Sequence, residues 1–466
     1  VGQPGEKSVG LPDREIGTVA ALRHELADMP GVSIRYAVAD DRTGIPIPAR
    51  FLSHHGQPGL ERTSGEGAPR VDSQIDFTHG HALPAETQAA WTGTLTIPST
   101  GTYVLHMEIL GAYGTLELDG KKIAHNGRMV LHGDITQAGE SDVLPTTDGL
   151  DNVSATRELQ GGPHALSLTV TPDSSHHPVQ IRLSWLTPEQ KRANFDAAVE
   201  TARQAKTAVV FVWAQGDPRF QIPDDQNRLV QAVAAVNKHT IVVLNLSQPV
   251  DLPWLKNVKA VLLMWWPGDE GGWATANLLL GKVSPAGRLP FTWGRSIADY
   301  PATDPAHPER GGSNLSGTGV FSEGIYVGYR WFDQQKIEPL FPFGFGLSYT
   351  RFAYSSLTVK PAADGGLDVG FTIRNIGAVA GDEVPQVYLG PPSVRPAGVQ
   401  FAVRALAGFD RIHLQPGASQ AVALHIPPRC LEYWSVQRNR WVAASAGRTV
   451  FVGSSSRDLP LQAQVP

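Results

Sequence analysis

The sequence has little cysteine, little net charge and no long apolar run, and each absence excludes a class of protein. Cys430 is the only cysteine among 466 residues, so an intrachain disulfide is excluded, and no cysteine–histidine cluster has the spacing of a structural zinc site. With 39 basic and 44 acidic residues, the net charge of −5 gives no basic surface for nucleic acid or an anionic membrane. The apolar runs are shorter than the ~18 residues that span a bilayer. We therefore expect no metal, no cofactor, no nucleic acid and no membrane partner.

The N-terminus also lacks start signals. The chain has no initiator methionine, and no basic stretch precedes an apolar one, so no signal peptide is visible. We expect the chain to begin inside a larger protein. The sequence leaves the location of that protein open, with bacterial secreted and cytoplasmic locations both compatible with one cysteine. It leaves formation of a homo-oligomer open as well.

Glycine and proline, in contrast, are abundant. The 48 glycines and 36 prolines together make up about 18% of the 466 residues, above the combined share of ~12% in average proteins. Hydrophobic residues make up 41% of the sequence. This combination indicates many turns in a β-rich globular protein rather than disorder. At roughly 150 residues per domain, the length predicts three domains.

The first part of the chain is predicted to be short α/β elements followed by a β domain. Apolar residues at helical spacing predict a helix over 13–27, and a strand is expected over 32–37. From about 45 to 187, alternating runs are separated by Gly, Pro, Asn and Asp, and Asp119-Gly120 is typical of a two-residue hairpin turn. This region is interpreted as an all-β sandwich.

From Pro188 the helical period returns. Helices are expected over 188–207 and 224–238, the second with Asp224 as its N-cap. They alternate with the apolar runs TAVVFVWA, TIVVLNLS and VKAVLLMWW, which predicts a parallel sheet covered on both faces. From about Tyr349 onward, alternating runs return at the spacing of an immunoglobulin-like sandwich. The predicted fold class is α/β plus all-β, with a discontinuous α/β sandwich.

Three segments resemble signature sequences of glycoside hydrolase family 3: MWWPGDEGGWATANLLLGKVSPAGRLPFTW, FSEGIYVGYRWFD and EPLFPFGFGLSYTRFAYS. The runs WTGTLTIPSTGTYVLHM and LELDGKK make the β insert similar to a PA14 domain. RNIGAVAGDEVPQVYL resembles the fibronectin-III-like domain that ends many family-3 β-glucosidases. The resemblance implies five parts: the first part of the α/β sandwich (1–44), a PA14-like β-sandwich insert (45–187), the rest of the α/β sandwich (188–293), a connecting segment (294–348) and a fibronectin-III-like β-sandwich (349–466).

This resemblance implies a retaining, exo-acting β-glucosidase that hydrolyses terminal β-D-glucosyl residues with two carboxyl groups about 5–5.5 Å apart. In the family, the nucleophilic Asp belongs to a Ser-Asp-Trp-like motif on an N-terminal (β/α)8 barrel, and this sequence has neither the motif nor eight βα units. The expected partners are a glycoside substrate and a barrel outside these 466 residues, so the chain alone is expected to be catalytically incomplete. The rival interpretation is a non-catalytic carbohydrate-binding or scaffold module built on the PA14-like domain.

The family also implies a position for the general acid/base. Its Glu-Gly-x-Asp-Arg-like loop corresponds here to AQGDPRF, which places Gln215 at the position of the Glu and Arg219 at that of the Arg. Gln cannot transfer a proton near neutral pH, although it can hydrogen-bond a glycosidic oxygen. Three interpretations stay open: an engineered Glu→Gln change, a natural relative with a weakened or relocated acid, and an alignment shift that makes Asp217 the acid. Asp217-Pro218 is equally typical of a plain turn.

A few further residues are candidates for contacts with the sugar. Arg219 is a candidate sugar contact by position, and Trp213 fits either core packing or stacking on a sugar ring. Arg42 and the insert loop 128–134 are candidates for the rim of a sugar site. The Pro-Gly and Gly-Gly steps around Glu270 are interpreted as structural, at the start of a helix.

Overall fold

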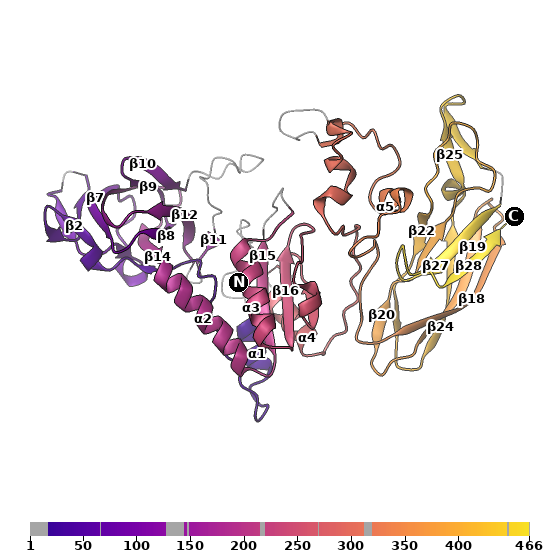
Figure 1. Cartoon of the computed structure of the whole chain (residues 1–466), viewed down its shortest axis with the longest axis horizontal. Coiled ribbons are helices and arrows are strands. Elements are labelled where there is room, and N and C mark those ends of the chain that lie inside the picture. Colours follow the sequence, from indigo (N-terminus) through magenta and orange to yellow (C-terminus); the bar gives the residue numbers. More distant parts are fainter. Residues whose placement is uncertain are drawn as a thin grey trace. The chain divides into compact units, whose positions relative to one another are not determined.

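The computed structural model describes residues 17–65, 67–126, 144–146, 149–214, 220–268, 270–311, 319–444 and 447–465 (Figure 1). The chain forms two compact units. The first unit comprises Val1–Ala214, Pro223–Leu246 and Pro253–Ala274, and the second comprises Gln215–Ile222, Ser247–Leu252 and Thr275–Pro466.

A β sandwich occupies much of the first unit. One sheet has the order β1-β14-β8-β12-β11 with β6 beside β14, and the other has the order β10-β9-β13-β7-β2-β3 with β4 and β5 attached. The strands are β1 (Ile45–Pro46), β2 (Leu52–His54), β3 (Gln57–Pro58), β4 (Leu60–Thr63), β5 (Arg70–Asp72), β6 (Asp76–Phe77), β7 (Ala89–Ile97), β8 (Gly101–Leu110), β9 (Ala112–Leu118), β10 (Lys121–His125), β11 (Leu144–Pro145), β12 (Asp151–Leu159), β13 (Gly162–Pro172) and β14 (Gln180–Leu186).

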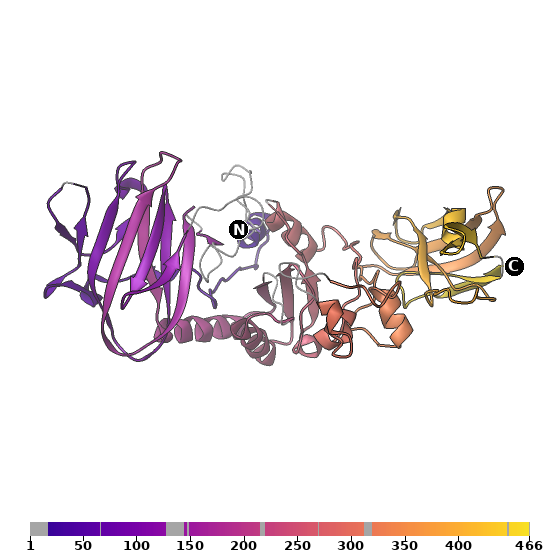
Figure 2. The same ribbon diagram turned by 90° about the horizontal axis from the view of Figure 1, so that it is seen from above.

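The two sheets share one core because alternate residues of the long strands point inward. Trp91, Leu105 and Leu168, from three different strands, are each 0% exposed. The predicted hairpin turn is present: Asp119 and Gly120 join β9 to β10, and both have positive φ, 52° and 72°. Figure 2 shows the long strands of this sandwich and helix α2 (Pro188–Gln204), which follows β14.

A three-stranded parallel sheet follows the sandwich in the chain. Its order is β15 (Ala208–Ala214), β16 (Thr240–Leu246) and β17 (Ala260–Leu263), and both pairings are parallel as predicted. Helix α3 (Asp224–Val236) connects β15 to β16, and α4 (Gly271–Leu279) follows β17. Thr187 and Gln190 form a capping box at the start of α2, which ends the sandwich and begins the helical part.

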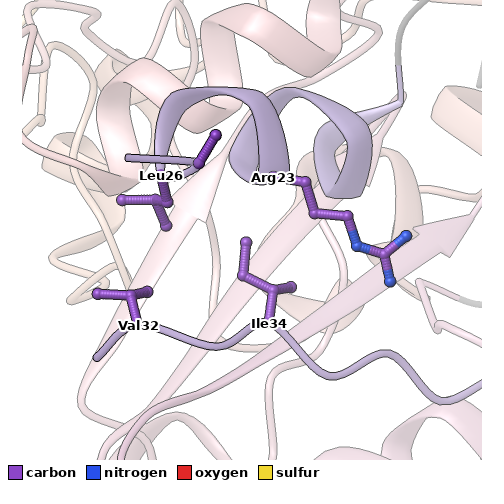
Figure 3. Close-up of a pocket in the computed structure, with 5 residues that line it drawn as sticks. Arg23, Leu26, Val32 and Ile34 are labelled. Carbon is purple, nitrogen blue, oxygen red and sulfur yellow. The ribbon is translucent and has the colours of Figure 1, made fainter. Parts of the chain in front are cut away.

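Helix α1 (Thr18–Glu25) is shorter than predicted, and the strand expected over 32–37 was wrong. Predicted helix residues 13–16 lie outside the described residues. Residues 32–38 are not in any strand, and Val32 and Tyr36 are 49% and 63% exposed. An alternating apolar run forms a strand only where a neighbouring strand offers free backbone N–H and C=O groups. Among the described residues, no strand pairs with residues 32–37. Instead, Val32 and Ile34 line an open pocket together with Leu26, the residue that follows α1 (Figure 3).

The second unit contains short helices followed by antiparallel sheets. The sheet orders are β18-β19-β24 and β22-β21-β27-β28, with the pairs β20-β23 and β25-β26. The elements are η6 (Ile297–Asp299), η7 (Pro301–Thr303), η8 (Pro308–Gly311), α5 (Tyr329–Gln335), β18 (Phe352–Pro361), β19 (Leu367–Asn375), β20 (Gly381–Glu383), β21 (Gln386–Leu389), β22 (Ala405–Phe409), β23 (Ile412–Leu414), β24 (Ser419–Ile426), η9 (Pro428–Leu431), β25 (Glu432–Ser435), β26 (Arg440–Ala443), β27 (Arg448–Gly453) and β28 (Leu461–Val465).

One core joins the two larger sheets of this unit. Ile373, Val387 and Val450 are each 0% exposed. Helix α5 is fixed to these sheets by the buried carboxylate of Asp333, which pairs with Arg404 at 2.9 Å and Arg457 at 3.0 Å. The fold is therefore mixed α/β with one parallel sheet and several antiparallel sheets.

Candidate active site

The carboxyl end of β15 is the described structure nearest in sequence to the predicted acid/base position. Strand β15 pairs with β16 along its whole length, from Ala208 opposite Thr240 to Ala214 opposite Leu246. Gln215, Asp217 and Arg219 follow directly and lie outside the described residues, so their roles stay predictions. The described residues show what holds the strand end that leads into this segment.

Gln226 of α3 holds the backbone of Trp213. Its side-chain amide accepts a hydrogen bond from the Trp213 N–H and donates one to the Trp213 carbonyl, both at 2.9 Å. The Gln226 side chain is buried, and a buried amide satisfied on both sides fixes the groups that it contacts. The end of β15 is therefore set by the first turn of α3 as well as by β16.

The indole ring of Trp213 contacts a cation. The guanidinium carbon of Arg42 lies 5.5 Å from the ring centroid, within the range of a cation–π interaction. The Trp213 Nε1 is buried and has no hydrogen-bond partner among the described residues. Trp213 is thus half-buried and packed, and its donor faces no acceptor of the described chain.

A charged pair lies at the start of α3. Lys191 Nζ of α2 is 3.0 Å from Asp225 Oδ2, and Asp225 Oδ1 accepts the Gln226 N–H at 3.0 Å. Burial raises the pKa of Asp225, but the hydrogen bond and charge of Lys191, with the Gln226 N–H and the charge of Arg42, hold that pKa below its usual value. Asp225 is therefore an ionised structural group and a poor proton donor.

The predicted N-cap of α3 was wrong. The helix begins at Asp224 itself, its N-cap is Pro223, and no side chain caps it. Because Pro223 takes the cap position, Asp224 and Asp225 lie in the first turn, where acidic side chains interact favourably with the helix dipole.

The turn after β17 has a structural explanation. Gly268 has a φ of +70°, and a Cβ on Gly271 would lie 2.6 Å from a ring carbon of Pro267. Only glycine permits that approach, which confirms the structural interpretation of the first glycine of the Gly-Gly step. Glu270 is exposed and its carbonyl accepts the Ala274 N–H at 3.0 Å, while Asp269 lies outside the described residues.

Asp251 is a further carboxylate, in the second unit, that the sequence analysis missed. Its N–H donates to the carbonyl of Phe220 at 2.8 Å, and Phe220 directly follows segment 215–219. Burial raises the pKa of Asp251, and the neighbouring Asp299 raises it further. Asp251 Oδ1 is buried without a partner among the described residues, whereas Asp299 Oδ2 accepts the N–H of Arg295 at 2.7 Å. Asp251 lies in no sequence motif. Its raised pKa comes from burial, which the sequence alone does not show.

Within the described ranges, no group of three His, Cys, Asp or Glu side chains is placed to hold a metal ion. No helix in that part of the chain combines the length and apolar character needed to cross a membrane. Residues 128–134, a predicted rim of the site, lie outside the described residues.

Comparison with known proteins identifies the family. Residues 64–349 match the glycosyl hydrolase family 3 C-terminal domain, and residues 383–456 match a fibronectin type III-like domain. The chain belongs to glycosyl hydrolase family 3. Its family-3 relatives include probable beta-glucosidase L of Aspergillus terreus, 38% identical over 92% of this chain and 59% of the relative, and a beta-glucosidase of Rhizobium radiobacter, 39% identical over 57% of this chain and 33% of the relative.

A solved structure shares the fold over almost the whole chain. DesR, a beta-glucosidase from Streptomyces venezuelae in complex with D-glucose, is 32% identical with a TM-score of 0.72, covering 98% of this chain and 53% of DesR. A beta-glucosidase from Kluyveromyces marxianus matches with a TM-score of 0.64 at 22% identity, which shows the fold alone. The chain spans between one third and three fifths of the length of these curated relatives.

Proposed function

We propose that this chain is the C-terminal part of a retaining, exo-acting β-glucosidase that hydrolyses terminal β-D-glucosyl residues. The observation that carries the proposal is the match to DesR, a β-glucosidase in complex with D-glucose, over 98% of this chain. The nucleophilic Asp is proposed to come from a (β/α)8 barrel outside these 466 residues. The substrate is a glycoside, and the aglycone is not specified by the residues described.

In this proposal the group at position 215, which follows β15 in the sequence, occupies the role of the general acid/base. A carboxylic acid there would protonate the leaving oxygen and then activate water against the glycosyl-enzyme. The backbone of Trp213, two residues earlier, is held by two hydrogen bonds to Gln226. Arg219 and Trp213 are proposed sugar contacts.

Because residue 215 is Gln, the source of the acid has three candidates. Either Gln215 replaces a Glu, or Asp217 is the acid, or a carboxyl elsewhere performs the proton transfer. Asp251 suits the third possibility, since burial raises its pKa as a general acid requires. Its backbone N–H donates to the carbonyl of Phe220, the first described residue after 215–219 in the sequence.

The finer domain assignment belongs to the same proposal. We assign the β sandwich, within 45–187, to a PA14-like insert between two parts of the α/β sandwich, 1–44 and 188–293. Residues 294–348 are the connecting segment, and 349–466 are the fibronectin-III-like domain. The order of elements, with α1 before the β sandwich and α2 after it, supports this assignment.

The test uses the complete polypeptide that contains this chain, with 4-nitrophenyl β-D-glucopyranoside as substrate and proton NMR to follow the released sugar. We expect hydrolysis with β-glucose as the first product, because two displacements restore the starting configuration. Initial release of α-glucose would contradict a retaining mechanism. Glucose binding without any hydrolysis would instead favour the carbohydrate-binding module.

A further inference from the structure

Two exposed tryptophans lie side by side on the hairpin of β25 and β26 in the second unit. Trp434 is directly opposite Trp441 in this pairing, and the two residues are 45% and 44% exposed. Their ring centroids are 5.7 Å apart, with an interplanar angle of 74°. Soluble proteins bury most of the surface of tryptophan, so a pair that stays nearly half exposed is a candidate binding surface. We call this side of the hairpin the tryptophan face.

The opposite face of the hairpin packs on the rest of the unit. Tyr433 points to that face, because successive side chains alternate along a strand. Its ring centroid is 6.0 Å from that of Phe401, and the guanidinium carbon of Arg448 is 5.8 Å from the Phe401 centroid. Arg448 also donates to the carbonyl of Leu431, directly before β25, at 2.8 Å. The hairpin is therefore fixed from behind, and the tryptophan face points outward.

Trp441 is itself held by a cation. The guanidinium carbon of Arg429 lies 4.2 Å from the Trp441 ring centroid, within the range of a cation–π interaction. Among the described residues, no cation and no ring other than Trp441 lies against Trp434. Because the two indoles meet at a steep angle, Trp441 covers at most one face of Trp434. At least one face of the Trp434 indole is therefore open to a stacking partner.

The polar groups beside the two rings carry opposite charges. Arg429 Nε is 3.5 Å from Glu432 Oε2, and Glu432 shares the tryptophan face with Trp434 because the two residues are two apart on β25. The guanidinium donates hydrogen bonds and the carboxylate accepts them. Their charges cancel, so this pair gives no net attraction for an anion. A purely apolar partner would bury both charged groups without new hydrogen bonds, which costs free energy.

We propose that the tryptophan face binds a neutral oligosaccharide of β-linked glucosyl residues, with one ring stacked on Trp434 and its hydroxyls bonded to Glu432 and Arg429. The hydroxyls of a β-glucosyl ring are equatorial, which leaves C–H groups on both faces for stacking on an indole. Edge hydroxyls both donate and accept hydrogen bonds, as the paired Glu432 and Arg429 require. This hairpin lies within the fibronectin type III-like match, residues 383–456, and membership of a glycosyl hydrolase family supports a carbohydrate ligand. The binding does not require the proposed hydrolysis.

The experiment measures binding of cellohexaose to the purified 466-residue chain by calorimetry, with hydrogen exchange of residues 429–443 as the local measurement. The variants are Trp434→Ala, Trp434→Phe and Glu432→Gln. Phe409→Ala is the matched control, because Phe409 is an aromatic residue of the same unit, on β22, and is 64% exposed. Hexagalacturonic acid is the anionic comparison.

We expect cellohexaose to slow hydrogen exchange within 429–443 in the wild-type chain. Trp434→Ala should weaken binding about tenfold, the upper range for one aromatic contact, and Trp434→Phe should lie between that variant and wild type. Glu432→Gln should weaken binding about three- to tenfold through loss of a charged hydrogen-bond acceptor. Phe409→Ala should bind as wild type does.

Equal binding by wild type and Trp434→Ala, or unchanged exchange of residues 429–443, would overturn the proposal. Tighter binding of hexagalacturonic acid would reject a neutral ligand. Self-association that is lost in Trp434→Ala would assign the tryptophan face to a second copy of the chain. Much slower exchange of 429–443 in the complete polypeptide than in this chain, without sugar, would assign that face to a contact with the rest of the polypeptide.

This test and the test of the proposed function fail separately. No step of the binding experiment measures hydrolysis, so an inactive complete polypeptide would leave the result at the tryptophan face unchanged. An active β-glucosidase without binding at residues 429–443 would reject this inference and leave the proposed function intact.

Discussion

At the residue scale, the predicted position of the general acid/base, Gln215, carries an amide in place of a carboxyl group. An amide has nearly the shape of a carboxylic acid but cannot give or accept a proton near neutral pH. The resemblance predicts this position directly after TAVVFVWA; the structure confirms that run as strand β15, and the role of Gln215 stays a prediction.

We predict that Gln215→Glu raises kcat of the complete enzyme about 10²- to 10⁴-fold, the usual contribution of general acid–base catalysis. The measurement is the steady-state rate on 4-nitrophenyl β-D-glucopyranoside. Asp217→Asn and Asp251→Asn serve as matched comparisons. An unchanged rate in Gln215→Glu, with a large loss in one of the Asn variants, would move the acid to that Asp.

His106 makes a second prediction at this scale. Its side chain is 2% exposed, and burial lowers its pKa to about 4, against a smaller opposing effect of the Asn152 hydrogen bond. Between pH 6.5 and about 4, the unfolded chain holds a proton on this imidazole and the folded chain does not. Stability therefore falls as the pH falls through this window, by at most about 3 kcal/mol from this group, and no further below it.

The measurement is the free energy of unfolding of the β sandwich from pH 7 to 4 for wild type and His106→Gln. The variant should lose less stability across this window. His164 is the comparison with the opposite sign, because its hydrogen bond to Asp119 raises its pKa and stabilises the fold at low pH. Parallel pH curves for wild type and His106→Gln would contradict the account.

At the element scale, periodicity predicted the parallel sheet and its helices because the apolar positions of these elements are the ones that the fold buries, among them Val210, Val230 and Val242. Strands β15 and β16 and helix α2 lie close to their expected bounds. The strand over 32–37 failed because pairing depends on a neighbour, which local alternation does not reveal. The sequence analysis missed the hydrogen bond from the Trp213 N–H of β15 to the side chain of Gln226. Gln226 stands three residues after Pro223, but the sequence alone does not show which backbone group its side chain contacts.

The capping box of α2 carries the prediction at this scale. Thr187 Oγ1 accepts the Gln190 N–H at 3.2 Å, and Gln190 Oε1 accepts the Thr187 N–H at 3.1 Å. Thr187→Ala should lower the stability of the first turn of α2 by about 1 kcal/mol. Hydrogen exchange of residues 188–191 measures this. Thr201→Ala, inside the same helix, should leave those amides unchanged, and equal effects of both variants would reject the capping role.

At the scale of the whole molecule, composition predicted much of the organisation correctly. Excess glycine and proline indicated β structure, and both units contain antiparallel sheets. The family followed from long motifs, since 264–293 lies within the matched range 64–349. The site was less predictable, because Arg42 and Trp213 are 171 residues apart and only folding brings them together.

The proposed function is that this chain supplies one part of a β-glucosidase that uses two carboxyl groups. Its most direct test compares 4-nitrophenyl β-D-glucopyranoside hydrolysis by the purified 466-residue chain and by the complete polypeptide that contains it. We predict no hydrolysis above background by the chain alone and clear turnover by the complete polypeptide, and that turnover should be lost when the proposed nucleophilic Asp of the proposed barrel is replaced by Asn. Turnover by the 466-residue chain alone would contradict the account.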